Sequence, residues 1–226
     1  MQVAPAYSFQ LSRLLLRSLA LFQGDKDRPA IASTCIEIQR RATGLARITL
    51  VATDGRRLAS YQGDIEQDTL FGEIPATDHF LVALDGIASL PKITGPYGDR
   101  VTVEVYEKSI DFVAESLRYT ARRQEADVKF PDWRSIIPTT PPESLDQFAV
   151  NYELLADFGK TAKWLNPEVP SLGLRSFGPG RCIAVLLPKD DAFFGLIMPM
   201  VFDAALTVPE WLQFTQAEPA PTPAAA

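Results

Sequence analysis

The chain has 226 residues, of which 46% are apolar, and a formal net charge of −6. This length suits one large domain or two small ones, and the apolar fraction is sufficient for a buried core. The negative charge excludes a protein that is basic over its whole surface, such as a histone-like coat, but it allows nucleic-acid binding at a local cluster of Lys and Arg.

The two cysteines, Cys35 and Cys182, lie in separate apolar runs and form no C-x-x-C pair. We interpret them as buried free thiols in a reducing compartment. The N-terminus lacks the basic and apolar regions of a secretion signal, and no run approaches the roughly 18 apolar residues of a membrane span. The sequence therefore predicts a cytoplasmic protein that does not enter a membrane.

The first predicted unit is a helix followed by three antiparallel strands. Apolar residues at helical spacing predict the helix over 8–23, with Ser8 as its N-cap. Residues 31–40 alternate between apolar and polar and predict a strand. Two further strands, 47–53 and 57–61, flank Asp54-Gly55, a residue pair typical of a tight two-residue turn.

The second unit repeats this order after a turn-rich stretch. We expect a strand at 79–84 and a helix at 85–93 capped by Asp85, and then the strands 101–106, 109–115 and 117–123. Valines alternate with polar residues in the first of these three strands, which is typical of a sheet with one face exposed to water.

The third unit is predicted as a strand at 148–150, a helix at 152–165 capped by Asn151, and the strands 171–177, 181–187 and 192–198. One such unit cannot bury its sheet alone, so two units must pack together. We therefore divide the chain into a complete domain of two units (1–138), a half domain of one unit (139–200) and a C-terminal extension (201–226) with a Pro- and Ala-rich flexible tail from about residue 215.

Three short segments carry a family resemblance. They are ATDGRRLA at 52–59, FPDWRSIIP at 130–138 and IMPM at 197–200. They resemble, in the same order, segments of the bacterial DNA polymerase III β subunit, the sliding clamp, as if its middle domain were joined to the second half of its last domain. The resemblance implies an α+β DNA-clamp fold of repeated β-α-β-β-β units, with antiparallel sheets outside and helices on the inner face.

The resemblance also implies a function without chemistry. A clamp encircles duplex DNA and tethers a polymerase or a repair enzyme through a hydrophobic pocket that accepts a short peptide. Carried onto the matching motifs, that pocket consists of Thr53, Gly55, Arg57, Leu58, Pro131, Ile136, Ile137, Leu196, Met198, Pro199 and Met200. Without the resemblance, these residues would be interpreted as the ordinary core of a domain seam. Arg56 replaces the histidine that the family usually has.

Four cations on the first and third helices are candidates for nonspecific contact with the DNA backbone: Arg13, Arg17, Lys160 and Lys163. The alternative is an ordinary solvated helix face. Known clamps close with twelve units, which three units per chain reach only as a tetramer. We therefore expect a homo-oligomer, with a monomeric, clamp-derived interaction module as the alternative.

Nothing in the sequence indicates an enzyme. His79 is the only histidine and has no partnered nucleophile at a recognisable spacing, and no phosphate-binding glycine motif follows a strand. We expect no catalytic residues, no metal and no cofactor. The segment 208–214 carries an apolar cluster, which is interpreted either as a peptide that docks in the chain's own pocket or as an added strand or helix on the sheet.

Overall fold

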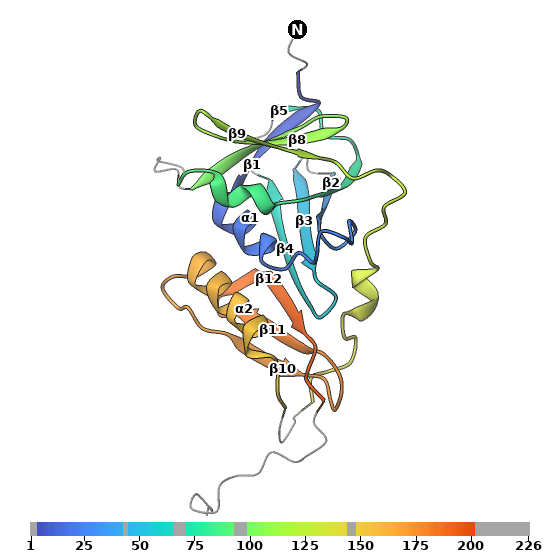
Figure 1. The fold of residues 1–226 in the computed structure, drawn as a ribbon, viewed down its shortest axis with the longest axis vertical. Helices are drawn as coiled ribbons and strands as arrows, with labels where there is room; N and C mark the ends of the chain where they lie inside the picture. The colour runs from blue at the N-terminus through green and yellow to red at the C-terminus, as the bar shows by residue number, and fades with distance from the viewer. Residues whose placement is uncertain (1–3, 43–44, 66–70, 93–98, 144–147, 202–226) are drawn as a thin grey trace, which may run out of the picture.

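The computed structural model describes residues 4–42, 45–65, 71–92, 99–143 and 148–201 (Figure 1). The helices are α1 (Arg13–Ala20) and α2 (Tyr152–Leu165), together with the short 3₁₀ helices η2 (Asp85–Ser89) and η3 (Trp133–Ile136). The strands are β1 (Tyr7–Ser12), β2 (Thr34–Arg40), β3 (Ala46–Thr53), β4 (Arg57–Ile65), β5 (Phe71–Gly72), β6 (Thr77–Val82), β7 (Arg100–Val105), β8 (Ser109–Ala114), β9 (Leu117–Arg122), β10 (Gly173–Ser176), β11 (Ile183–Leu187) and β12 (Asp190–Ile197).

The first unit (β1, α1, β2–β4) and the second unit (β6, η2, β7–β9) exchange their first strands. β1 pairs antiparallel with β7 of the second unit, and β6 pairs antiparallel with β2 of the first unit. Each three-stranded meander therefore gains a fourth strand from the other unit. This exchange explains why the two units form one body, because neither sheet is complete alone.

The third unit (148–150, α2, β10–β12) joins the first through its last strand. β12 pairs antiparallel with β4, so that one sheet runs in the order β10-β11-β12-β4-β3-β2-β6. The second sheet has the order β5-β1-β7-β8-β9. The longer sheet thus crosses the division that the sequence places at residue 138, and that division stays a prediction.

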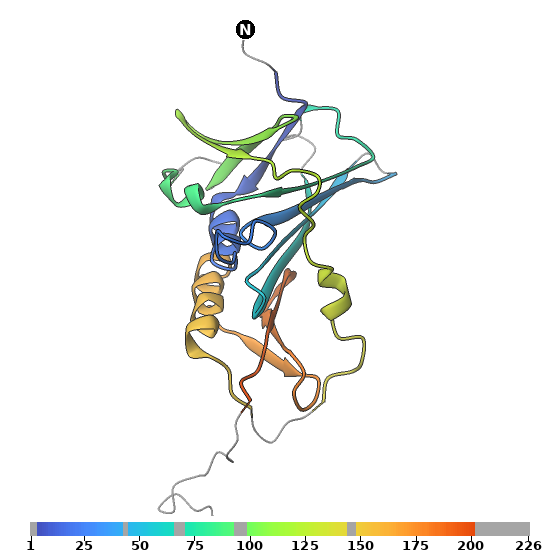
Figure 2. The same cartoon turned by 45° about the vertical axis from the view of Figure 1, so that its right-hand side comes forward.

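The seven-stranded sheet has two differently covered faces. Helices α1 and α2 lie side by side against one face, and the segment that contains η3 crosses the other (Figure 2). On the helical face the ring of Phe158 packs against Phe22, with centroids 4.6 Å apart, and against Phe193 at 6.4 Å. On the opposite face a smaller buried cluster contains Leu58 and Leu196. Alternation along β4 and β12 supplies apolar side chains to both faces.

The predicted helix over 8–23 is wrong in its first third. Tyr7, Phe9 and Leu11 alternate with period two, and pairing of β1 with β7 places all three in the core. The N-cap is therefore Ser12, whose hydroxyl accepts a hydrogen bond from the backbone N–H of Leu15, and not Ser8.

The second predicted helix is also shorter than expected. Residues 85–89 form the 3₁₀ helix η2, and Asp85 lies inside it rather than capping it. The Asp85 carboxylate instead accepts hydrogen bonds from Lys26 and Tyr119, which lower its pKa. The strand β5 lies within the stretch interpreted as turns. The end of the predicted helix, at residue 93, is outside the described residues.

The remaining elements match the sequence closely, with two exceptions. Asn151 caps α2 as predicted, since its side chain accepts a hydrogen bond from the N–H of Glu153. Residues 148–150 belong to no strand. The turn at Asp54-Gly55 is longer than two residues, because the last pair of β3 and β4 is Thr53 with Leu58. Within it, Gly55 has a left-handed backbone, with φ of 88°.

Candidate functional site

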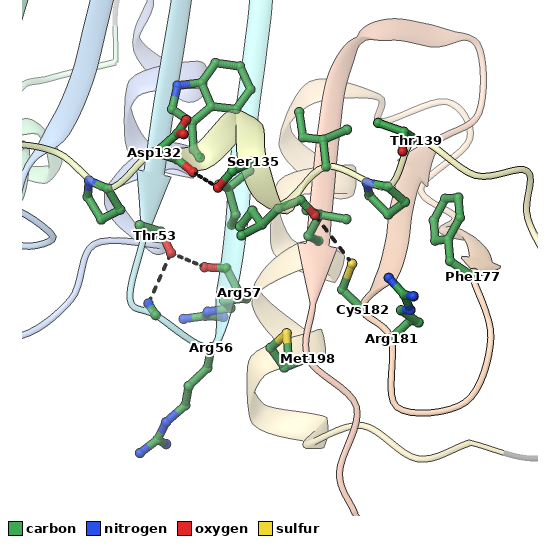
Figure 3. Close-up of a pocket in the computed structure, with 18 of the residues that line it drawn as sticks. Thr53, Arg56, Arg57, Asp132, Ser135, Thr139, Phe177, Arg181, Cys182 and Met198 are labelled. Atoms are coloured by element: carbon green, nitrogen blue, oxygen red, sulfur yellow. Dashed lines mark hydrogen bonds between the residues drawn. The ribbon is translucent and has the colours of Figure 1, made fainter.

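A cavity of about 650 Å³ opens on the outer face of the seven-stranded sheet, where all three motif segments meet (Figure 3). Its lining comes from the turn between β3 and β4, from the segment around η3, from the loop before β11 and from the end of β12. The main contributors are Thr53, Gly55, Arg56, Arg57, Leu58, Pro131, Trp133, Ser135, Ile136, Ile137, Pro138, Phe177, Arg181, Cys182, Leu196 and Met198.

The floor of the cavity is formed where β4 meets β12. Leu58 and Leu196 lie directly opposite each other in this pairing and are 1% and 2% exposed. The preceding turn is fixed by Thr53, whose hydroxyl donates to the carbonyl of Arg57 at 2.7 Å and accepts from the N–H of Gly55 at 3.1 Å. The turn therefore holds a rigid apolar floor beneath the opening.

One wall is the 3₁₀ helix η3, which is anchored to β2 by charge. Arg134 donates to the carboxylate of Glu37 at 2.9 Å, and its guanidinium lies 4.2 Å from the centre of the Trp133 ring. The hydrogen bond from Arg134 lowers the pKa of Glu37. This pair and the stacked ring hold the wall over the sheet, so that Ile136 projects at the rim with half of its surface exposed.

The rim on the other side consists of more adaptable side chains. Met198 is half exposed, and its backbone N–H donates to the carbonyl of Arg56 at 2.9 Å. The Arg56 side chain points away from the cavity (Figure 3). Cys182 has a free thiol near the carbonyl of Ile136, with the sulfur 3.9 Å from the oxygen. Because burial raises the pKa of Cys182, the thiol is protonated at neutral pH. Methionine and a neutral thiol give this rim an adaptable, polarizable surface.

Arg57 contributes to the cavity mainly by holding its surroundings. Its guanidinium, 7% exposed, donates to the carboxylates of Asp54 at 3.0 Å and Asp157 at 2.8 Å. It also donates to the carbonyls of Leu21 and Leu154, at 2.8 and 2.9 Å. These bonds tie the turn to the end of α1 and to α2 through the sheet. Removing Arg57 would free all three attachments.

Nine of the eleven residues predicted for the pocket line the cavity, and Pro199 and Met200 do not. The backbone N–H of Met200 donates to the carbonyl of Ala149, in the segment before α2. The sequence reasoning missed Trp133 and Ser135, although both lie inside the quoted FPDWRSIIP motif. It also missed Phe177 and Cys182, for which there is no local signal, because only the pairing of β10–β12 brings them to the rim.

The four predicted DNA-facing cations are not equivalent. Arg13 is buried and donates to Asp99 at 2.9 Å, so it does not fit that role. Arg17 is half buried, with its guanidinium 4.9 Å from the centre of the Trp164 ring. Lys160 is exposed but paired with Asp157 at 2.7 Å, and Lys163 is exposed. The helical face therefore presents a small basic patch of Arg17, Lys160 and Lys163.

This architecture is similar to that of several solved structures. The chain superposes on the DNA polymerase sliding clamp of Bacillus subtilis with a TM-score of 0.61 at 15% identity, covering 89% of this chain and 66% of that chain. The β subunit of DNA polymerase III from Thermotoga maritima gives 0.61 at 15% identity, covering 89% and 68%. The Helicobacter pylori β clamp in complex with carprofen gives 0.66 at 11% identity, again covering 89% and 68%.

The chain has the sliding-clamp fold. It spans about two thirds of the length of these clamps, and the likeness lies in structure far more than in sequence. No protein-family model and no curated protein matches it. The fold class predicted from the three motifs is therefore confirmed.

Among the residues that the structure describes, no group of three or more His, Cys, Asp or Glu side chains could hold a metal ion. No helix in the same part of the chain is long and apolar enough to cross a membrane.

Proposed function

We propose that this chain is a clamp-like processivity factor of the cytoplasm. It holds duplex DNA within a homo-oligomeric ring and tethers a DNA polymerase or a repair enzyme through the cavity on its outer face. It does so without catalysing a reaction. The observation that carries the proposal is the joining of all three motif segments around one apolar cavity in a clamp fold.

The shape and chemistry of the cavity suit a short peptide. A volume of about 650 Å³ is in the range of sites that bind small ligands, and the buried floor of Leu58 and Leu196 favours aliphatic and aromatic anchors. The flexible Met198 can adapt to more than one partner. One structure of similar fold, the Helicobacter pylori β clamp, is bound to a DNA ligase peptide. We propose the same class of ligand for this chain.

Two methionines provide a matched test of peptide binding. Met198 lines the cavity and Met200 does not, yet their exposed fractions are 50% and 49%. Met198→Asp places a charge at the apolar rim and should weaken binding of a fluorescent polymerase or ligase peptide at least about tenfold, or 1.4 kcal/mol. Met200→Asp should leave the affinity unchanged in the same anisotropy titration. Equal effects of the two changes would refute the assignment of the pocket.

The patch of Arg17, Lys160 and Lys163 would supply the contact with DNA. Such contact is nonspecific and depends on salt, because binding of cations to phosphates releases counterions. Lys163→Glu should therefore weaken binding to duplexes of any sequence to the same extent and reduce the salt dependence. Lys26→Glu is the control, because Lys26 is also exposed but is paired with Asp85 near η2. An unchanged affinity of Lys163→Glu would remove the patch from the proposal.

A second function is favoured by one observation. The helical face carries Glu153 and Asp157 beside its few cations, and the whole chain has a net charge of −6. A clamp-derived interaction module would bind a replication protein through the same cavity without encircling DNA. Such a module would retain the peptide affinity, the loss of affinity in Met198→Asp and the fold, but would show no binding to duplex DNA that is sensitive to Lys163→Glu.

A further inference from the structure

The first two units of the chain show what completes a unit. The first strand of each one never pairs with its own meander, but adds to the first meander strand of its companion. Thus β1 adds to β7, and β6 adds to β2. In both cases the pairing begins at the first residue of the meander: Ser12, just before α1, lies opposite Arg100, and Val82 lies opposite Thr34.

Within the residues that the structure describes, the third unit has no such companion. Its first meander strand, β10, lies at the end of the seven-stranded sheet. Its segment before the helix, residues 148–150, belongs to no strand. Both halves of the exchange are therefore present in the third unit. In the described part of the chain the outer edge of β10 is met by Glu143 and by no strand, and the segment 148–150 adds to no sheet.

In both the segment 148–150 and the strand β10, backbone N–H and C=O groups face the side on which a strand of a second copy could pair. The carbonyl of Ala149 accepts a hydrogen bond from the N–H of Met200. Once this segment pairs as a strand, the backbone N–H and C=O groups of Phe148 and Val150 face the opposite side. On β10 the carbonyl of Ser176 accepts a hydrogen bond from the backbone N–H of Glu143. The backbone N–H and C=O groups of Leu174, two residues earlier, therefore lie on the same outer edge. The Leu174 side chain is 39% exposed there.

We infer that the third unit binds the third unit of a second copy of this chain by reciprocal strand exchange. The segment 148–150 of each copy adds antiparallel to the outer edge of β10 in the other, which replaces the single bond from Glu143. The register of β1 on β7 carries over directly: the N-cap Asn151 lies opposite Gly173 of the second copy, and Val150 lies opposite Leu174.

A second copy of the chain fits as the partner because each third unit offers both the segment 148–150, which adds as a strand, and the β10 edge, which accepts it. A twofold axis uses the same strand edge and the same donor segment in both copies, so both orphan edges are paired at once. Helix α2 leaves room for this contact. Tyr152 is 77% exposed, and a side chain added at Gly159 would meet nothing within 4 Å. In the complete pair of units, α1 and η2 are in contact across the corresponding seam.

This inference depends on the fold and on the strand edges, and not on the binding of DNA or of a peptide. Loss of the dimer would therefore leave peptide affinity at the Met198 site intact. Conversely, equal effects of Met198→Asp and Met200→Asp on peptide affinity would leave the dimer unaffected. Each proposal can therefore be refuted without refuting the other.

A disulfide tests the register. The double change Val150→Cys and Leu174→Cys, made in a Cys182→Ser background, should give a covalent dimer under mild oxidation, because opposite residues of a bonded antiparallel pair lie about 5.5 Å apart, within disulfide range. Each single cysteine change should give no disulfide-linked dimer, since each places its thiol opposite a residue without one. A double variant that is dimeric by light scattering but forms no disulfide would overturn the register.

Two leucines test the edge itself. Leu174 lies on the edge strand β10 and Leu117 begins another edge strand, β9, with 39% and 52% of their surfaces exposed. Leu117→Asp should leave the dimer that the third units form, and Leu174→Asp added to that variant should raise the dissociation constant of this dimer at least about tenfold in light-scattering titrations. Circular dichroism should show both to be folded. A monomeric parent chain, or a dimer lost only in Leu117→Asp, would overturn the inference.

Discussion

A single buried side chain, Arg57, connects the pocket to both helices. It leaves the turn beside the cavity, passes to the helical face, and there binds two carboxylates and two helix-end carbonyls while its guanidinium lies 4.9 Å from the centre of the Phe22 ring. The sequence identified Arg57 through its motif but assigned it to the peptide. Its contacts instead indicate a residue that positions the floor of the pocket.

Replacement of Arg57 should therefore act mainly by lowering the stability of the fold. Arg57→Ala removes the buried partner of Asp54 and Asp157 and leaves Asp157 only the exposed Lys160. We expect the free energy of unfolding to fall by about 2–4 kcal/mol. Arg56→Ala, one position earlier with an exposed side chain, should change it by less than about 0.5 kcal/mol. Chemical denaturation measures both. A small effect of Arg57→Ala would mean that the network does not hold the helices to the turn.

The pair of Glu37 and Arg134 gives the pocket wall a dependence on pH. Because Arg134 lowers the pKa of Glu37 in the folded chain below its ordinary value of 4.5, the pair stabilises the fold fully above that value and loses its effect as pH falls through the lowered pKa. The wild type should exceed Glu37→Gln in unfolding free energy by up to about 1 kcal/mol at pH 7. The difference should vanish at acid pH.

A matched change separates this pair from general acid effects. Glu73 pairs with Arg40 at 3.4 Å, but its side chain is 87% exposed. Glu73→Gln should therefore match the wild type at every pH in the same denaturation series. A difference between wild type and Glu37→Gln that persists at low pH would rule out the charge pair as the anchor of η3.

At the scale of elements, alanine substitutions at two glycines of the third unit should change stability in opposite directions. A side chain at Gly195 on β12 would lie 2.3 Å from the Phe158 ring, whereas one at Gly159 in α2 would meet nothing. Gly195→Ala should destabilise the fold by about 1–3 kcal/mol through overpacking. Gly159→Ala should raise the stability of α2 by about 0.5–1 kcal/mol. Thermal unfolding of both variants would show whether α2 packs on β12 as described.

The elements also show what the sequence could predict. The meander strands were predictable because each alternates over one covered face. β1 was missed because its period-two apolar residues run directly into the leucines of α1, and together they imitate one longer helical stripe. The pairing of β12 with β4, which builds the floor of the pocket, was not predictable from local pattern, because it joins residues more than 130 positions apart. The motif resemblance alone indicated that these segments meet.

At the scale of the whole molecule, the three units form a line with two unused ends. The second unit ends at the free edge of β9, and the third ends at β10 and the segment 148–150. Under our proposals, pairing of third units would join two chains into six units, and pairing of β9 edges would join two such dimers into the twelve units that we expect of a closed ring. Light scattering should therefore give a tetramer for the parent chain and a dimer for Leu117→Asp.

Threading on DNA tests the central claim most directly. The protein is incubated with a linear duplex fixed to a bead at one end, the free end is then capped with a bulky protein block, and the beads are washed in about 1 M salt, where charge contacts are screened. An encircling ring predicts retention on capped DNA and loss from uncapped DNA. Equal loss from both would contradict encirclement and would favour the interaction module.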